Sequence, residues 1–108
     1  MDENLKKIKE IIIQTAKEMN IEIDKIILFG SRARGDYRED SDYDLLIVTK
    51  EKLDKEKELK FLTKVHRKLV EILEKPIDIL IENEKDFEEE SKYLGYIYFW
   101  INKEGIKI

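Results

Sequence analysis

The stretch from Ile26 to Val48, IILFGSRARGDYREDSDYDLLIV, carries most of the features that predict both a fold and a site. Two short apolar runs, Ile26 to Phe29 and Leu45 to Val48, have the length and composition of buried strands. The segment between them is rich in Gly, Arg, Asp and Ser and is too polar to belong to a core. We therefore predict two strands joined by a connection that builds a functional site.

Composition bounds the class of protein that this chain can be. Its 108 residues are 42% hydrophobic and 43% charged, which suits a single domain over residues 1–108 with a modest core. There is no cysteine, so disulfides and thiolate metal sites are excluded. No apolar stretch approaches the roughly 20 residues of a membrane span, and the N-terminus lacks the apolar segment of a signal peptide. We therefore expect a cytoplasmic protein without a membrane partner.

The charge balance argues against long nucleic acids as partners. The chain carries 25 acidic and 21 basic residues, which gives a net charge of −4. Because a protein that binds long nucleic acid needs a positive field over its surface, we expect no such binding.

The apolar periodicity and the turn residues divide the chain into helices and strands. The predicted elements are a helix over 3–19, strands over 25–29 and 42–49, a helix over 54–75, a strand over 77–82, a helix over 85–103 and an edge strand over 106–108. Asp54 is the predicted N-cap of the long helix, while Pro76 and Gly105 are predicted to end the last two helices. This order predicts an α+β fold with helices packed on a small mixed sheet, although the pairing directions cannot be read from sequence.

Helical spacing also predicts which residues of the two later helices face the core. In the long helix these are Leu59, Leu62, Val65, His66, Leu69, Ile72 and Leu73, and in the last helix Phe87, Leu94, Ile97, Tyr98 and Ile101.

Two acidic residues, Asp42 and Asp44, open the second predicted strand. Residues two apart on a strand point to the same face, so both carboxylates should project together, about 7 Å apart along the chain. Two like charges beside a core are costly unless a cation compensates them, and hard oxygen ligands select Mg²⁺ or Mn²⁺. Asp78 lies alone in the apolar third strand. If that strand neighbours the second, Asp78 completes a three-carboxylate cluster able to hold two ions about 3.5 to 4 Å apart.

The residues around Gly30 form the predicted anion-binding side of the site. Gly30 lets the backbone approach a ligand closely, and the turn after it exposes backbone N–H groups. Ser31 can cap a short helical turn that Gly35 ends, and its hydroxyl can also reach a phosphate oxygen. Arg34 could contact a phosphate, brace a carboxylate or simply be exposed.

Each feature has a simpler explanation when it is taken alone. A D-x-D pair most often marks a solvated strand end, and a single acid on a strand can face water. We interpret Arg32 and Arg38 as surface residues and His66, the only histidine, as a packed or boundary residue. The combination of the acids with Gly30 and Ser31 is what favours a site for phosphate and metal.

The complete pattern resembles the signature of the polymerase-beta nucleotidyltransferase superfamily: Gly30-Ser31, ten further residues, then Asp42-Tyr43-Asp44. The fuller strings GSRARG and SDYDL resemble its minimal members, the MNT antitoxins of HEPN/MNT toxin–antitoxin modules. The resemblance covers nearly the whole chain, including the single acid in PIDIL, and nothing in the sequence departs from the motif.

This resemblance implies a role for each motif residue. Gly30 and Ser31 would hold the triphosphate of ATP, Asp42 and Asp44 would bind Mg²⁺, and Asp78 would complete the site. The reaction would transfer AMP from ATP to a hydroxyl and release pyrophosphate. In the antitoxin branch the acceptor would be a tyrosine of a HEPN ribonuclease toxin, which the modification inactivates.

Two alternatives stay open: a non-catalytic antitoxin that neutralises its toxin by binding, and a nucleotidyltransferase that acts on a small molecule or an RNA end. We expect the latter less, because the sequence shows no further domain to hold such an acceptor. Tyr93, Tyr96 and Trp100 lie on a face that the last helix does not need for its core, which favours a surface for a partner or for self-association. Burial under a loop is the other explanation. Six acids and two lysines over 82–92 could oppose a basic partner.

Overall fold

A four-stranded mixed sheet forms the centre of the computed structural model, which describes residues 2–108. The elements in chain order are α1 (Glu3–Glu18), β1 (Ile23–Phe29), α2 (Ser31–Arg34), β2 (Tyr43–Thr49), α3 (Lys55–Leu73), β3 (Ile77–Asn83), α4 (Glu84–Glu90), α5 (Ile97–Glu104) and β4 (Ile106–Lys107). The strands lie in the order β3-β2-β1-β4. β2 runs antiparallel to β1 and parallel to β3, and β4 pairs antiparallel with the end of β1. This arrangement confirms the predicted α+β class and supplies the strand directions.

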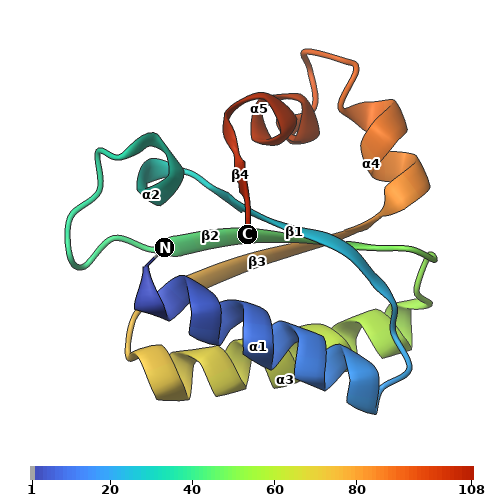
Figure 1. Ribbon diagram of the computed structural model, residues 1–108. Coiled ribbons are helices and arrows are strands. Elements are labelled where there is room, and N and C mark those ends of the chain that lie inside the picture. Colours follow the sequence, from blue (N-terminus) through green and yellow to red (C-terminus); the bar gives the residue numbers. More distant parts are fainter. Residues whose placement is uncertain (1) are drawn as a thin grey trace.

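Helices cover both faces of the sheet (Figure 1). α1 and α3 pack on one face over the larger apolar cluster, while α4 and α5 cover part of the other face over a smaller one. Successive strand residues alternate between these faces. In β2, for example, Leu45 and Ile47 join the larger cluster and Leu46 and Val48 the smaller one. No helix within residues 2–108 is long and apolar enough to span a membrane.

The predicted long helix is confirmed at its start and is shorter at its end. The Asp54 carboxylate accepts a hydrogen bond of 2.8 Å from the backbone N–H of Lys57, as expected for an N-cap worth about 1 kcal/mol. The helix ends at Leu73, where Glu74 takes a left-handed conformation with φ 52°, instead of continuing to residue 75. The reason lies in Pro76, because the residue before a proline is disfavoured in helical conformation.

The core-facing stripe of α3 differs from the predicted one. Its buried residues follow a spacing of four and are Phe61, Val65, Leu69 and Leu73. Three residues predicted for the stripe fall beside it and are exposed: Leu59, His66 and Ile72. Only one narrow face of the helix is needed to cover the sheet beside α1. The aliphatic side chains of Leu59 and Ile72 therefore remain in solvent, although helical spacing would allow them to face the core.

The predicted last helix is wrong as a single element, because the chain forms two helices, α4 and α5. The rings of Phe87 and Tyr98 lie edge to face with centroids 5.9 Å apart. A continuous helix would separate these residues by about 16 Å along its axis. The connection over 91–96 therefore folds α5 back onto the same small core. In consequence Leu94 and Ile97, predicted as core, are 66% and 53% exposed.

The closing edge strand is confirmed. Gly105 ends α5 as predicted, and a Cβ there would collide with the side chain of Ile27 and the carbonyl of Ile101. The missing side chain lets the chain pass directly from α5 into β4 beside β1.

Candidate active site

The end of β1 is shaped by Gly30, which has φ 74° and leads into α2. A Cβ at this position would collide with the Oδ2 atom of Asp44, so only glycine fits both the backbone conformation and the space. Gly30 is also the N-cap residue of α2, with no side-chain capping bond. The prediction that Ser31 caps this turn is therefore wrong: Ser31 is its first helical residue. Gly35 ends the turn with φ 90°, as predicted.

Asp44 lies at the centre of the candidate site. In the sheet register it stands between Phe29 of β1 and Asp78 of β3. Because Asp44 and Asp78 are direct partners in a parallel pair, their side chains lie on the same face of the sheet. This is the neighbouring arrangement of the second and third strands on which the three-carboxylate prediction depended.

Asp42 is placed differently from the sequence prediction. β2 begins at Tyr43, so Asp42 is exposed and lies one residue before the strand. Its carboxylate still acts on Asp44 electrostatically. The two carboxylates that share a face of the sheet are therefore those of Asp44 and Asp78, on neighbouring strands, and not those of Asp42 and Asp44 on one strand.

The electrostatics of Asp44 are those of an uncompensated acid. Burial raises the pKa of its carboxyl, and the negative charges of Asp78 and then Asp42 raise this pKa further, while Arg34 opposes them. Within residues 2–108, no hydrogen bond or ion pair of less than 4 Å reaches the Asp44 side chain. A half-buried carboxylate with like-charged neighbours and no partner has the donor chemistry that suits a hard divalent cation.

The three predicted carboxylates do not meet at one point. In the part of the chain that the structure describes, no group of three His, Cys, Asp or Glu side chains is arranged to hold a metal ion. The charges of Asp42 and Asp78 each act on Asp44. The metal assignment therefore stays a prediction that the acid types and their charge fit.

Arg34 is exposed, and its guanidinium lies 3.5 Å from the carboxylate of Asp36. Its positive charge also lowers the pKa of Asp44, so Arg34 is close enough to stabilise the charged form of that carboxylate. Whether it contacts a nucleotide stays a prediction.

Arg32 is the residue that sequence reasoning missed. Its guanidinium lies over the ring of Tyr43, 4.0 Å from the centroid, and donates to the carbonyls of Ser41 and Glu39 at 3.1 and 2.8 Å. These contacts tie the loop that precedes Asp42 to the start of β2. The interpretation of Arg32 as a surface residue is therefore wrong. Its partners are backbone carbonyls distant in sequence, and no local pattern identifies such contacts.

Tyr43 fixes the acidic segment to the opposite side of the sheet. Its ring is 1% exposed, and its hydroxyl accepts from the Asn4 side chain at 3.0 Å and donates to Asp2 at 3.2 Å. The N-terminus of α1 thereby supports the strand that carries Asp44.

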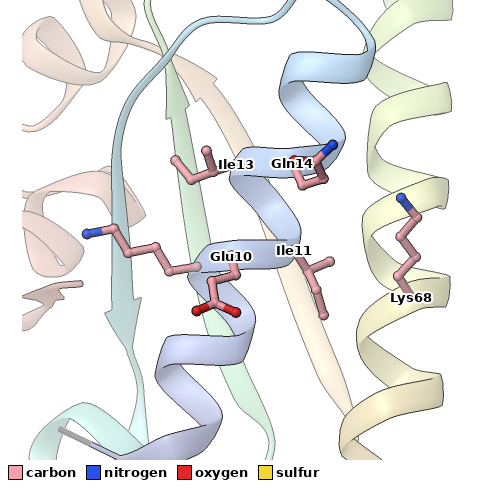
Figure 2. Close-up of a pocket in the computed structure, with 6 residues that line it drawn as sticks. Glu10, Ile11, Ile13, Gln14 and Lys68 are labelled. Carbon is pink, nitrogen blue, oxygen red and sulfur yellow. The ribbon is translucent and has the colours of Figure 1, made fainter.

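Two other features lie outside this site. His66 is exposed, with Nε2 3.1 Å from the carbonyl oxygen of Ile77, which agrees with a boundary residue. A hollow of about 580 Å³ on the outer side of α1 and α3 contains Glu10, Ile11, Ile13 and Lys68 (Figure 2). None of the predicted site residues lines it.

The three aromatic residues singled out in the sequence are exposed. Tyr93, Tyr96 and Trp100 have between 45% and 53% of their surface accessible, and Leu94 and Ile97 are exposed between them. They come from the α4–α5 connection and α5, and not from one continuous helix. This excludes their burial under a loop.

Comparison with known proteins identifies the family. Two proteins of Methanocaldococcus jannaschii, both provisionally named protein adenylyltransferases, are 56% identical over 43 residues and 50% identical over 46 residues. These matches cover 40% and 39% of this chain and 43% and 46% of the relatives, so the matched part is less than half of each relative's length.

Solved structures agree over more of the chain. A protein provisionally named a minimal nucleotidyltransferase matches with a TM-score of 0.63 and 26% identity, covering 100% of this chain and 97% of its own. A chain from the toxin–antitoxin complex MntA-HpeT shares the fold with a TM-score of 0.55 at 18% identity, covering 93% of this chain and 70% of that one. The profile of the nucleotidyltransferase domain family matches residues 5–107. Since this match covers nearly the entire sequence, the chain belongs to the nucleotidyltransferase domain family.

Proposed function

We propose that this protein transfers AMP from ATP to a hydroxyl in a Mg²⁺-dependent reaction, and that the acceptor is a tyrosine of a HEPN ribonuclease toxin. The protein would then act as the antitoxin of that partner. The observation that carries the proposal is the position of Asp44, which lies opposite Asp78 and directly against the Gly30 turn in a chain of the nucleotidyltransferase family.

The residues have distinct roles in this proposal. Asp42, Asp44 and Asp78 would hold the metal, which would supply positive charge for the leaving pyrophosphate and would lower the pKa of the acceptor hydroxyl. The absence of a side chain at Gly30 leaves room for the triphosphate chain, and the Ser31 hydroxyl would donate to a phosphate oxygen.

The chemical step is a substitution at the α-phosphorus of ATP. The acceptor oxygen forms a bond to this phosphorus, the bond to the β-phosphate oxygen breaks, and pyrophosphate leaves. Asp78 is the exposed acid of the sheet pair and takes the hydroxyl proton. Arg34, whose charge acts on Asp44, would offset the negative charge of the phosphates.

The support for a protein acceptor comes from the relatives. Both curated proteins are named as protein adenylyltransferases, and the MntA-HpeT structure is described as a toxin–antitoxin complex. The HEPN class of partner and the tyrosine acceptor come from the resemblance of the GSRARG and SDYDL strings.

Isotope position tests the reaction type. The chain, Mg²⁺ and a HEPN-type protein, as the proposed partner, are incubated with ATP labelled at either the α- or the γ-phosphate. Label on the partner from α-labelled ATP alone supports nucleotidyl transfer. Label from γ-labelled ATP would indicate phosphoryl transfer and would contradict the proposal.

A second candidate, neutralisation by binding alone, is favoured by the exposed aromatic cluster of Tyr93, Tyr96 and Trp100. The discriminating experiment is toxin suppression in cells by a double variant, Asp42→Asn with Asp44→Asn. Full suppression would support binding alone, whereas its loss with an intact complex would support catalysis.

A further inference from the structure

β3 is an outermost strand of the sheet, and one of its backbone edges faces away from β2. The carbonyl of Pro76 accepts from the N–H of Tyr43 at 3.0 Å, so the backbone groups of Pro76 point toward β2. Adjacent residues of a strand point their backbone groups in opposite directions. Ile77, Ile79 and Ile81 therefore direct theirs to the open edge, where the Ile77 carbonyl contacts His66. Among residues 2–108, no other hydrogen bond to these edge groups is found, so they can pair with an added strand.

A hollow of about 380 Å³ lies along this edge, between β3 and α3. Its lining consists of Leu62, Thr63, His66 and Arg67 from α3 and Ile77, Asp78 and Ile79 from β3. Asp78, the acid proposed to take the proton of the acceptor hydroxyl, thus borders this hollow.

The two faces of β3 carry different side chains: isoleucines on one face and Asp78 on the other. Ile77 and Ile79 belong to the larger core on the α1 and α3 side, so Asp78 projects to the opposite face with Asp44. Side chains of an added strand alternate in the same way. A residue placed over Asp78 would therefore have its two sequence neighbours directed to the α3 side, into the hollow.

The lining of the hollow contains one acid, Asp78, which projects to the opposite face of the sheet, and one cation, Arg67, on the α3 side. Arg67 is exposed, and none of the carboxylates of residues 2–108 lies within 4.0 Å of it. His66 adds a second polar donor or acceptor on the same helix face. An acidic side chain is the complementary occupant.

We infer that the acceptor is an extended polypeptide segment that adds to the edge of β3. Its hydroxyl residue lies on the Asp78 face, and an acidic residue immediately before or after it reaches Arg67. This inference rests on the proposed nucleotidyl transfer. It names how the acceptor is recognised: by backbone pairing along β3 and by charge in the hollow.

The test uses a library of nine-residue peptides with a central tyrosine and random flanking residues. The full chain, ATP and Mg²⁺ are added, and AMP-modified peptides are sequenced by mass spectrometry. We expect Asp and Glu to be enriched next to the tyrosine. For the best peptide, Arg67→Glu should raise KM roughly fivefold with kcat unchanged, the effect of losing one partly exposed ion pair. Lys7→Glu makes the same charge change on an exposed part of α1 and should leave KM unchanged.

Backbone methylation of the best peptide tests strand pairing separately. One version is N-methylated at the tyrosine and the other at its two neighbours, so that the methyl groups lie on opposite edges of an extended segment. Strand addition predicts that only one version loses modification. Loss in neither version, or equal loss in both, would overturn the inference.

Nucleotide binding distinguishes a failure of the acceptor inference from a failure of the proposed function. ATP analogue binding is measured by calorimetry on the same protein samples. If ATP binds but no peptide is modified, or if Arg67→Glu leaves the preference for acidic neighbours unchanged, the groove assignment is wrong. If the chain binds no nucleotide, the proposed function itself fails, and the acceptor inference fails with it.

Discussion

The carboxylate of Asp44 lies against Gly30, in the space that the Cβ of any other residue would occupy. This contact joins the end of β1 to the start of β2. It explains why a glycine with φ 74° is found at this point and couples the predicted phosphate side of the site to its acidic side.

Gly30→Ala should therefore disrupt the site more than its small size suggests. The added methyl group would displace the Asp44 carboxylate, and we expect activity to fall at least about a hundredfold, as small misplacements of catalytic groups do. Gly35→Ala is the matched control, since Gly35 also has a positive φ, 90°, but a Cβ there meets nothing within 4 Å. Both variants should lose about 1 kcal/mol of stability through backbone strain. Equal activities in the two variants would refute a specific role for the Gly30–Asp44 contact.

Asp44→Asn should stabilise the metal-free protein while abolishing transfer. The charge of Asp44 is held among like charges, so its removal should raise the free energy of unfolding by on the order of 1 kcal/mol at pH 7. Asp40→Asn, in the exposed loop, is the control and should have little effect on either property.

The pH dependence of this gain follows from the raised pKa of Asp44. An unfolded aspartate has a pKa of about 3.9. A raised pKa in the folded state means that Asp44 favours folding below its unfolded pKa and that this contribution is lost as pH rises through the folded value. The advantage of Asp44→Asn should thus be full near pH 7 and shrink toward pH 4. Denaturant titrations of both proteins at pH 7 and pH 4 measure this difference in the free energy of unfolding. A difference that is larger at pH 4 than at pH 7 would contradict the prediction.

The strands and the turn that carry the candidate site could be predicted because their signals are local. The apolar runs around Gly30, the D-x-D spacing and the isolated Asp78 are all visible in one chain. Their spatial relation was not visible, because it depends on β2 and β3 being parallel neighbours in a register that pairs Asp44 with Asp78.

Arg32→Ala should loosen the loop between Gly35 and Asp42. It removes three hydrogen bonds to backbone carbonyls, one to the Tyr43 hydroxyl and the stacking on the Tyr43 ring, so we expect a loss of about 1 to 3 kcal/mol of stability. Arg32→Lys should recover only part of this loss, since an ammonium cannot reproduce the planar fork of the guanidinium. Thermal unfolding gives the measurement, with Arg38→Ala as the control. Equal effects of the two alanine variants would show that the Arg32 contacts contribute little.

Replacing the exposed aromatic residues should leave the fold intact. The double variant Tyr96→Ser with Trp100→Ser alters side chains that are about half exposed, and serine suits the N-cap position of α5 that Tyr96 occupies. We expect unchanged unfolding and at least about tenfold weaker binding to the HEPN-type partner by calorimetry. Leu59→Ser, which replaces a 63% exposed apolar residue on α3, should not weaken binding. Unchanged affinity in the double variant would remove this surface from the interface.

The features that sequence could not predict share a physical cause. The helical spacing of Phe87, Leu94, Ile97 and Ile101 continues across residues 91–96, so periodicity alone indicates one helix. The break becomes necessary only because Phe87 and Tyr98 must cover the same small core. The stripe on α3 likewise includes Phe61 and omits Leu59, because Phe61 lies four residues before Val65 on the face that packs into the larger core.

The central claim, AMP transfer to a protein hydroxyl, is tested most directly by intact-mass spectrometry. A HEPN-type protein, as the proposed partner, is incubated with the chain, ATP and Mg²⁺, in parallel with the Asp42→Asn, Asp44→Asn double variant. The account predicts that the partner gains mass in whole AMP units with the native chain and none with the variant. An unmodified partner in a stable complex with the native chain, or equal modification by the variant, would contradict it.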